Sequence, residues 1–203
     1  MSTDGSIFDK TYQFYMDQII ALDLKAIAPR LGADSRNGHW EIFLLGRRYA
    51  ITPEDIQTTK GERLSFEVCV ILFKHLLMCP DAPPTAGQWA HFRDLKDAGP
   101  LTVYWSENVE NAIVKRFQDA SPALAAAAKA LGGTPPAEPL AYDLDLIVPA
   151  LPRIPVRLLF NDAEEGFPAN GLLLFRQSSE HYLDAESLAV LGGLTARRLA
   201  AAV

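Results

Sequence analysis

The sequence predicts an α+β fold, with helices mainly in the N-terminal two-thirds and an antiparallel sheet contributed largely by the C-terminal third. Up to residue 131, apolar residues recur at intervals of three and four, which is typical of amphipathic helices. Over residues 140–148 apolar and mostly polar residues alternate, which is typical of a half-buried strand. A final helical pattern follows Asp184 and closes the chain. Helices followed by strands favour α+β over an alternating parallel sheet.

In the front half, a long helix is predicted over residues 7–28, because its apolar stripe is followed by Pro29 and Gly32. Two short runs at 40–45 and 48–51 are joined by Gly46-Arg47 and predict a hairpin. A second long helix is predicted over residues 64–78 and ends before Pro80.

The middle of the chain contains two further helix signals. We expect Ser106 to cap a helix that continues to Phe117. Ser121-Pro122 begins an Ala-rich helix that stops at Gly132-Gly133. The first of these helices follows a segment rich in Pro and Gly, in which only a short element at residues 89–95 is predicted.

The C-terminal third supplies the predicted sheet, with short apolar runs at 156–160 and 172–175 beside the strand at 140–148. We expect one α+β domain over residues 1–203. Within it, a helical subregion covers residues 1–131 and a sheet-rich subregion covers residues 138–203.

Composition and charge exclude several classes of protein. The chain has 203 residues, is 49% hydrophobic and carries 19 − 25 = −6 charges, which argues against disorder and against nucleic-acid binding. Its 2 cysteines are too few for a disulfide scaffold. The first residues contain no basic and apolar leader, and the longest apolar run is shorter than the roughly 20 residues that span a bilayer. We therefore expect a cytoplasmic protein without membrane insertion.

Familiar catalytic motifs are missing from the sequence. It contains no GxGxxG, GxxxxGK[ST], GxSxG, HExxH or CxxC motif. This weakens the simplest interpretations as a nucleotide-dependent enzyme, a serine hydrolase, a zinc protease or an iron–sulfur protein. The sequence leaves open whether the chain is an enzyme, and the missing motifs favour a protein that is not one. It assigns no catalytic residue and no cofactor.

Two groups of residues could hold a metal ion. The loop Asn161–Pro168 carries Asp162, Glu164 and Glu165, whose oxygens suit a hard cation, although an ordinary solvated turn is the favoured interpretation. A second group consists of soft or borderline ligands, namely Cys69, His75, Met78 and Cys79. Ten helical steps separate the two cysteines by about 280°, so core packing is favoured for this group.

Carboxylates and aromatic rings form two further groups. Asp143 and Asp145 share a strand face, with Arg157 expected opposite on the next strand, and we favour a solvent-facing strand over an acid–base pair. The aromatic group surrounds a Gly/Pro-rich region and could line a pocket or anchor loops on the core. Its candidate ligand-binding residues are Trp89, His91, Tyr104 and Trp105.

The C-terminal third carries a longer motif. It consists of Leu151-Pro152-x-Ile154-Pro155, Phe160-x-Asp162-x-Glu164-x-x-Phe167-Pro168, Leu174-Phe175, Ser178-Ser179, Tyr182-Leu183 and Glu186. Together these residues resemble the uncharacterised prokaryotic family known as domain of unknown function 3786, with the match strongest over residues 100–203. Asn161 stands where that family usually has glycine, and Arg176 where an aspartate often follows the phenylalanine.

The resemblance implies a type of organism and of metabolism, but no biochemical activity. The family is associated with anaerobic bacteria and archaea, and some members carry an iron–sulfur segment whose cysteine cluster this chain lacks. Our leading hypothesis is a non-catalytic binding or accessory module for a protein partner or a small molecule, linked by resemblance alone to anaerobic metalloenzyme or one-carbon metabolism. The alternatives are a metal-dependent enzyme that uses the acidic loop and a small-molecule carrier that uses the Trp89/Tyr104/Trp105 region.

Overall fold

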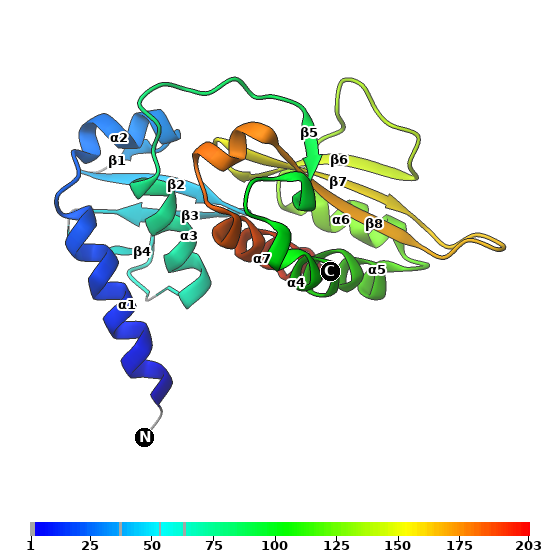
Figure 1. Ribbon diagram of the computed structural model, residues 1–203, viewed down its shortest axis with the longest axis horizontal. Coiled ribbons are helices and arrows are strands. Elements are labelled where there is room, and N and C mark those ends of the chain that lie inside the picture. Colours follow the sequence, from blue (N-terminus) through cyan, green and yellow to red (C-terminus); the bar gives the residue numbers. More distant parts are fainter. Residues whose placement is uncertain (1–2, 37, 53, 63) are drawn as a thin grey trace.

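The computed structural model describes residues 3–36, 38–52, 54–62 and 64–203, and it confirms the α+β fold. Two four-stranded antiparallel sheets, in the orders β1-β2-β3-β4 and β5-β8-β7-β6, are formed by these residues (Figure 1). The strands are β1 (Asp34–Arg36), β2 (His39–Leu44), β3 (Arg47–Ile51), β4 (Ile56–Thr58), β5 (Trp89–His91), β6 (Leu144–Leu151), β7 (Ile154–Asn161) and β8 (Asn170–Arg176). The α-helices are α1 (Thr3–Ile19), α2 (Leu24–Leu31), α3 (Phe66–Leu77), α4 (Thr102–Trp105), α5 (Asn111–Phe117), α6 (Ser121–Ala130) and α7 (Ala185–Ala201).

The helix expected over residues 7–28 is two helices, α1 and α2. The first helix ends at Ile19. The Asp23 side chain then accepts hydrogen bonds from the backbone N–H groups of Lys25 and Ala26 at the start of the second helix. An aspartate in this position starts a new helix, because it satisfies donors that have no partner within the helix. The prediction of one continuous helix was therefore wrong, although both segments are helical.

The predicted hairpin is confirmed as β2–β3, with its turn one residue earlier than expected. Leu44 pairs with Arg47, so the turn residues are Leu45 and Gly46, both with positive φ (46° and 78°). Two positive φ values match the twist of a tight hairpin. The Leu45 N–H donates to the Ala150 carbonyl at 2.9 Å, which ties the first sheet to β6.

The expectation that Ser106 caps a helix is wrong. Helical residues run from Thr102 to Phe117, and Ser106 begins a π-helical turn (Ser106–Glu110) inside that stretch, between α4 and α5. Its own backbone is helical, with φ −56° and ψ −46°, whereas a capping residue is extended. By contrast, α6 and α7 start where the sequence predicted, and the Asp184 side chain accepts a hydrogen bond from the Ser187 N–H.

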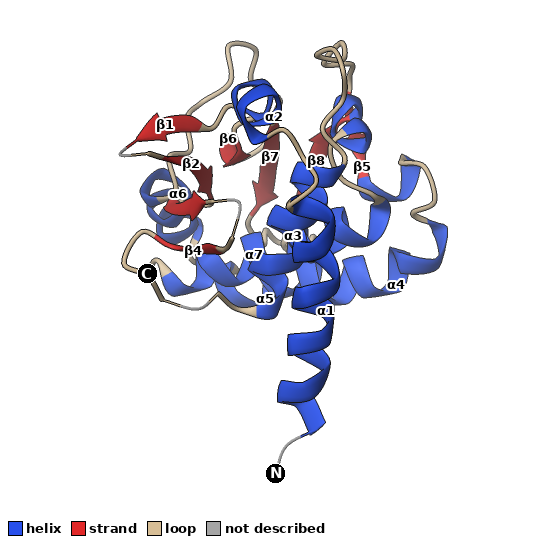
Figure 2. Ribbon diagram, turned by 90° about the vertical axis from the view of Figure 1, so that its left-hand side faces the viewer, coloured by secondary structure: helices blue, strands red, loops and turns tan. Residues whose placement is uncertain are grey.

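The second sheet has one apolar face and one mixed face. On β7, Val156, Leu158 and Phe160 are buried on the face covered by α5 and α6, while Arg157 and Asn161 point to the other face. The long helix α7 contacts α3, α5 and α6 and so lies at the centre of the helical layer (Figure 2). None of the described helices is long and apolar enough to cross a membrane.

Candidate functional site

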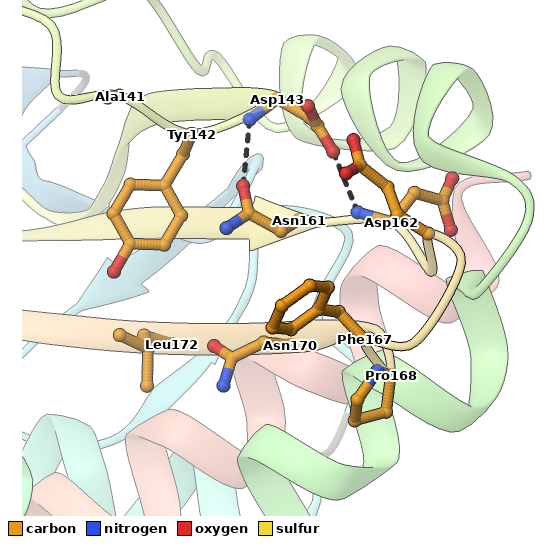
Figure 3. Close-up of a pocket in the computed structure, with 10 residues that line it drawn as sticks. Ala141, Tyr142, Asp143, Asn161, Asp162, Phe167, Pro168, Asn170 and Leu172 are labelled. Carbon is orange, nitrogen blue, oxygen red and sulfur yellow. Dashed lines mark hydrogen bonds between the residues drawn. The ribbon is translucent and has the colours of Figure 1, made fainter.

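The larger of two candidate clefts lies where β6 begins, β7 ends and β8 begins (Figure 3). We call this cavity of about 800 Å³ the acidic cleft. It is lined by Ala141, Tyr142, Asp143, Asn161, Asp162, Glu164, Phe167, Pro168, Asn170 and Leu172. Asn161 and Asn170 are directly opposite each other in the β7–β8 register, so their amides share one face of the sheet. The lining contains three carboxylates and no basic side chain.

Asp162, a predicted metal ligand, serves the fold. Its carboxylate accepts hydrogen bonds from the backbone N–H groups of Asp119 at 2.5 Å and Ser121 at 3.3 Å. Ala120 precedes α6 and has no side chain that could cap this helix. Asp162, from a distant loop, therefore accepts the Ser121 N–H at the start of α6 in its place. Desolvation raises the pKa of Asp162, but these hydrogen bonds outweigh it and the net pKa is lowered.

The remaining acidic residues of the loop are exposed. The backbone groups of Glu164 and Phe167 bond each other in both directions, and Gly166, with φ 84°, allows the tight turn between them. Glu164 lines the acidic cleft, whereas Glu165 is outside its lining. Within the described part of the chain, no three or more His, Cys, Asp or Glu side chains come together as a metal-binding group. The metal hypothesis therefore gains no geometric support and stays a prediction.

Asp145 and Arg157 form a buried ion pair, contrary to the solvent-facing strand that the sequence favoured. Two hydrogen bonds join the side chains, at 2.8 Å and 2.6 Å, and only 4% of Asp145 and 8% of Arg157 remains exposed. The loop before β6 covers the pair, because the Glu138 carbonyl accepts from Arg157 and the Leu140 N–H donates to Asp145. The bond from Arg157 lowers the pKa of Asp145 against the desolvation that raises it.

Asp143 lies apart from this ion pair, at the mouth of the acidic cleft. Its Oδ2 accepts the Asp162 N–H at 2.8 Å, and its own N–H donates to the Asn161 side chain at 3.0 Å. Asn161 therefore joins the start of β6 and the end of β7 through its side chain. An acid–base pair of Asp143 and Asp145 is not formed, because Asp145 is committed to Arg157.

The second cleft, which we call the aromatic cleft, has a volume of about 290 Å³ and lies beyond the end of β5. It is lined by His91, Phe92, Arg93, Thr102, Trp105, Ser106, Glu110 and Leu172. Two of the four candidate ligand-binding residues, His91 and Trp105, therefore come together in one cavity. Leu172 lines both clefts, on the segment of β8 that separates them.

Trp105 is held between aromatic rings and a glycine. Its ring stacks on Phe92, with centroids 4.4 Å apart and planes 10° apart, and contacts the Phe175 ring at a tilt. A Cβ atom at Gly192 of α7 would lie 2.2 Å from the Trp105 Cζ3 atom. Only glycine leaves room for the indole at this position of the helix.

Trp89 and Tyr104 are outside the aromatic cleft. Trp89 and Arg176 are directly opposite each other in the β5–β8 pair. The Arg176 Cζ atom lies over the Trp89 ring, 4.2 Å from the ring centroid. The Tyr104 hydroxyl lies next to Gly193 of α7, and the side chain is partly exposed. The pocket walled by Trp89, Tyr104 and Trp105 that the sequence suggested is thus not assembled from these three residues.

Sequence reasoning missed Glu110, which lines this cleft, and Gly192 of α7, which packs against the Trp105 ring. Residues five apart lie about 140° apart on an α-helix, so Glu110 is not expected beside Trp105 without the π-helical turn. For Gly192 a signal existed, because Gly192-Gly193 interrupts an otherwise strong helical pattern. Glycine inside a helix lowers its stability, and it often marks close packing.

The cysteine–histidine group is dispersed in the core. Cys69 and His75 are buried on α3, while Cys79 follows the helix with its Sγ near the Ile27 and Pro80 carbonyls. Burial lowers the pKa of His75 to about 4, although the Tyr182 backbone raises it in opposition. This arrangement agrees with the core-packing interpretation.

The fold and its clefts define an α+β protein with two antiparallel sheets, joined through β2 and β6, and a helical layer around α7. The chain belongs to the family described as a domain of unknown function (DUF3786), which matches residues 23–198. The family therefore covers the first sheet as well as the C-terminal motif from which the resemblance was drawn. Neither the curated proteins nor the solved structures contain a match to this chain.

Proposed function

We propose that this protein is a non-catalytic binding module that takes a cationic ligand in the acidic cleft. The observation that carries the proposal is the lining itself, which brings Asp143, Asp162 and Glu164 to one cavity without a basic side chain. A cleft lined by charge of one sign attracts ligands of the opposite sign. Its volume of about 800 Å³ lies within the range of ordinary ligand sites.

Aromatic and amide groups of the same cleft suit an organic cation better than a bare metal ion. Phe167 is 72% exposed, and its ring faces the same space as Tyr142 and the amides of Asn161 and Asn170 (Figure 3). Aromatic faces attract ammonium and guanidinium groups, and side-chain amides can bond the atoms around them. We therefore favour an Arg or Lys side chain presented by a partner protein.

The test is calorimetric titration with the peptide acetyl-Arg-Ala-Arg-amide and with the same peptide carrying citrulline in place of arginine. Citrulline keeps the shape but lacks the charge, so we expect it to bind more weakly. Glu164→Gln should weaken arginine-peptide binding by about 1.4- to fivefold, since an exposed ion pair contributes roughly 0.2–1 kcal/mol.

Glu165→Gln is the matched control, because it removes the neighbouring charge outside the lining. Equal binding of both peptides, or equal effects of the two variants, would refute the proposal. Titration with Ca²⁺, Mg²⁺ and Mn²⁺ tests the metal-dependent alternative separately. The cytoplasmic location and the setting in anaerobic metalloenzyme or one-carbon metabolism stay predictions from the sequence and from the resemblance.

A further inference from the structure

The aromatic cleft contains one half-buried carboxylate, which the buried Trp105 indole holds in place. The π-helical turn brings Glu110 to the side of Trp105, and the indole N–H bonds its carboxylate. Trp105 is 4% exposed and stacks on Phe92, so this donor belongs to the packed core. A carboxylate can accept about four hydrogen bonds, so Glu110 keeps acceptor positions for a molecule in the cleft.

A positive charge acts on this carboxylate from the rim of the cleft. Burial raises the pKa of Glu110, whereas the Trp105 indole and the charges of His91 and Arg93 lower it. Within the described part of the chain, Glu110 nevertheless forms no ion pair. The Arg93 side chain is 70% exposed, and its ion pair is with the exposed Asp94, at 3.9 Å. Such a pair contributes little to stability, so the guanidinium is free to turn toward a ligand.

The rest of the lining is mainly apolar. Phe92 and Trp105 are almost fully buried, so they form the floor of the cleft, and Leu172 contributes to the same lining. Ser106 adds a hydroxyl group at the start of the π-helical turn. The volume of about 290 Å³ is at the lower end of ligand pockets, which measure about 300–1,000 Å³. The cleft therefore suits a small molecule that carries two opposite charges and a short apolar group.

We propose that the aromatic cleft binds a free α-amino acid with an apolar side chain the size of leucine. The ammonium group donates hydrogen bonds to the Glu110 carboxylate and the Ser106 hydroxyl, and the Arg93 guanidinium holds the carboxylate in its planar fork. The apolar side chain lies on the floor of the cleft, where its burial is favourable. The proposal is independent of the function assigned to the acidic cleft, since Leu172 alone is shared by the two linings.

The test is a titration of the ¹⁵N-labelled protein with L-leucine, followed through the indole N–H signals of its 3 tryptophans by NMR. Because the Trp105 indole bonds Glu110, we expect its signal to move with saturation when the ammonium group reaches that carboxylate, while the Trp40 signal stays in place. 4-Methylpentanoate lacks the ammonium group, and L-leucinamide lacks the carboxylate. We expect each of them to bind at least fivefold more weakly than leucine.

Two variants test the two ends of the ligand separately. Glu110→Gln keeps an oxygen for the Trp105 indole but removes the charge, so it should weaken leucine binding at least fivefold without weakening 4-methylpentanoate binding. Arg93→Gln should weaken leucine binding at least fivefold without weakening leucinamide binding. Because Arg93 is exposed, this variant decides even if Glu110→Gln fails to fold.

Glu107→Gln and Lys96→Gln are the matched controls, because each removes a neighbouring exposed charge outside the lining. Both should leave leucine binding unchanged. Glu164→Gln should do so too, which separates this proposal from the one on the acidic cleft. A Trp105 signal that does not move at millimolar leucine, or equal binding of leucine and its two analogues, would overturn the proposal.

Discussion

The acidic and aromatic clefts differ in how their polar groups are satisfied. Around the acidic cleft, Asp162 accepts backbone N–H groups, and Asp145 beside it is paired with Arg157. In the aromatic cleft, burial raises the pKa of Glu110, and its hydrogen bond with the Trp105 indole lowers it in opposition. Much of the charge at the acidic cleft therefore holds the fold together, whereas the carboxylate of the aromatic cleft lies in surroundings that disfavour its charged form.

The largest effect is expected where a satisfied pair is broken. Arg157→Leu leaves the Asp145 carboxylate buried without its partner, and the free energy of unfolding should fall by about 3–5 kcal/mol. Urea denaturation measures this loss. Arg48→Leu is the control, because Arg48 and Asp34 form an exposed pair that contributes about 1 kcal/mol or less. Similar losses in the two variants would show that burial of the Asp145–Arg157 pair is unimportant.

His75 extends the comparison to a buried polar group in the core. Its pKa is lowered by burial to about 4 in the folded protein, against 6.5 as the ordinary value. Between these pH values the unfolded chain binds a proton that the folded protein does not, so stability should fall as the pH drops from 6.5 to 4. The full difference amounts to about 3 kcal/mol.

Urea midpoints measured at several pH values between 7 and 4 check this expectation. His75→Phe removes the titrating group and keeps a ring beside Tyr182, so its stability should depend less on pH over the same interval. Parallel profiles for the two proteins would contradict the assignment to His75.

A smaller effect on the free energy of unfolding is expected where Trp105 packs against α7. Gly192→Ala puts a methyl group 2.2 Å from the Trp105 Cζ3 atom, so the indole must move, and we expect a loss of about 1–3 kcal/mol. This loss opposes the gain of about 1 kcal/mol that alanine normally brings to a helix.

Gly193→Ala is the matched control for this site. Its methyl group would meet the Tyr104 hydroxyl, the far end of a partly exposed side chain, at 2.9 Å. We expect it to be neutral or stabilising, and to leave the Trp105 indole NMR signal in place. Equal melting temperatures for the two variants would show that Trp105 does not need glycine at position 192.

Local patterns were sufficient to predict most elements. The alternation before residue 148 and the Ser121-Pro122 start predicted β6 and α6, because the pleat of a strand and the preference of proline for the first helical turn depend on near neighbours. The break after Ile19 was missed although Asp23 carried a capping signal, since the apolar stripe continues through it. Local signals therefore compete, and an apolar stripe that continues across a capping residue hides the end of a helix.

The candidate sites depend on contacts between distant residues. Asp162 satisfies the start of α6 from more than 40 residues away, and a single loop of acids gave no sign of this. Glu110 reaches Trp105 only through a π-helical turn, which the apolar period does not reveal. Composition could thus identify candidate residues, but it could not show which of them already form hydrogen bonds or ion pairs within the fold.

The smallest effect on stability is expected at the rim of the acidic cleft, where the effect on binding should be clear. Phe167 is 72% exposed, so Phe167→Ser should change the free energy of unfolding by less than about 0.5 kcal/mol. It should weaken arginine-peptide binding about two- to fivefold, because an exposed cation–π contact contributes roughly 0.5–1 kcal/mol. Val103→Ser changes an equally exposed apolar residue outside the acidic cleft and should leave binding intact. If Phe167→Ser destabilises the fold instead, the ring packs against the loop, and the exposed charge of Glu164 is left to attract the ligand.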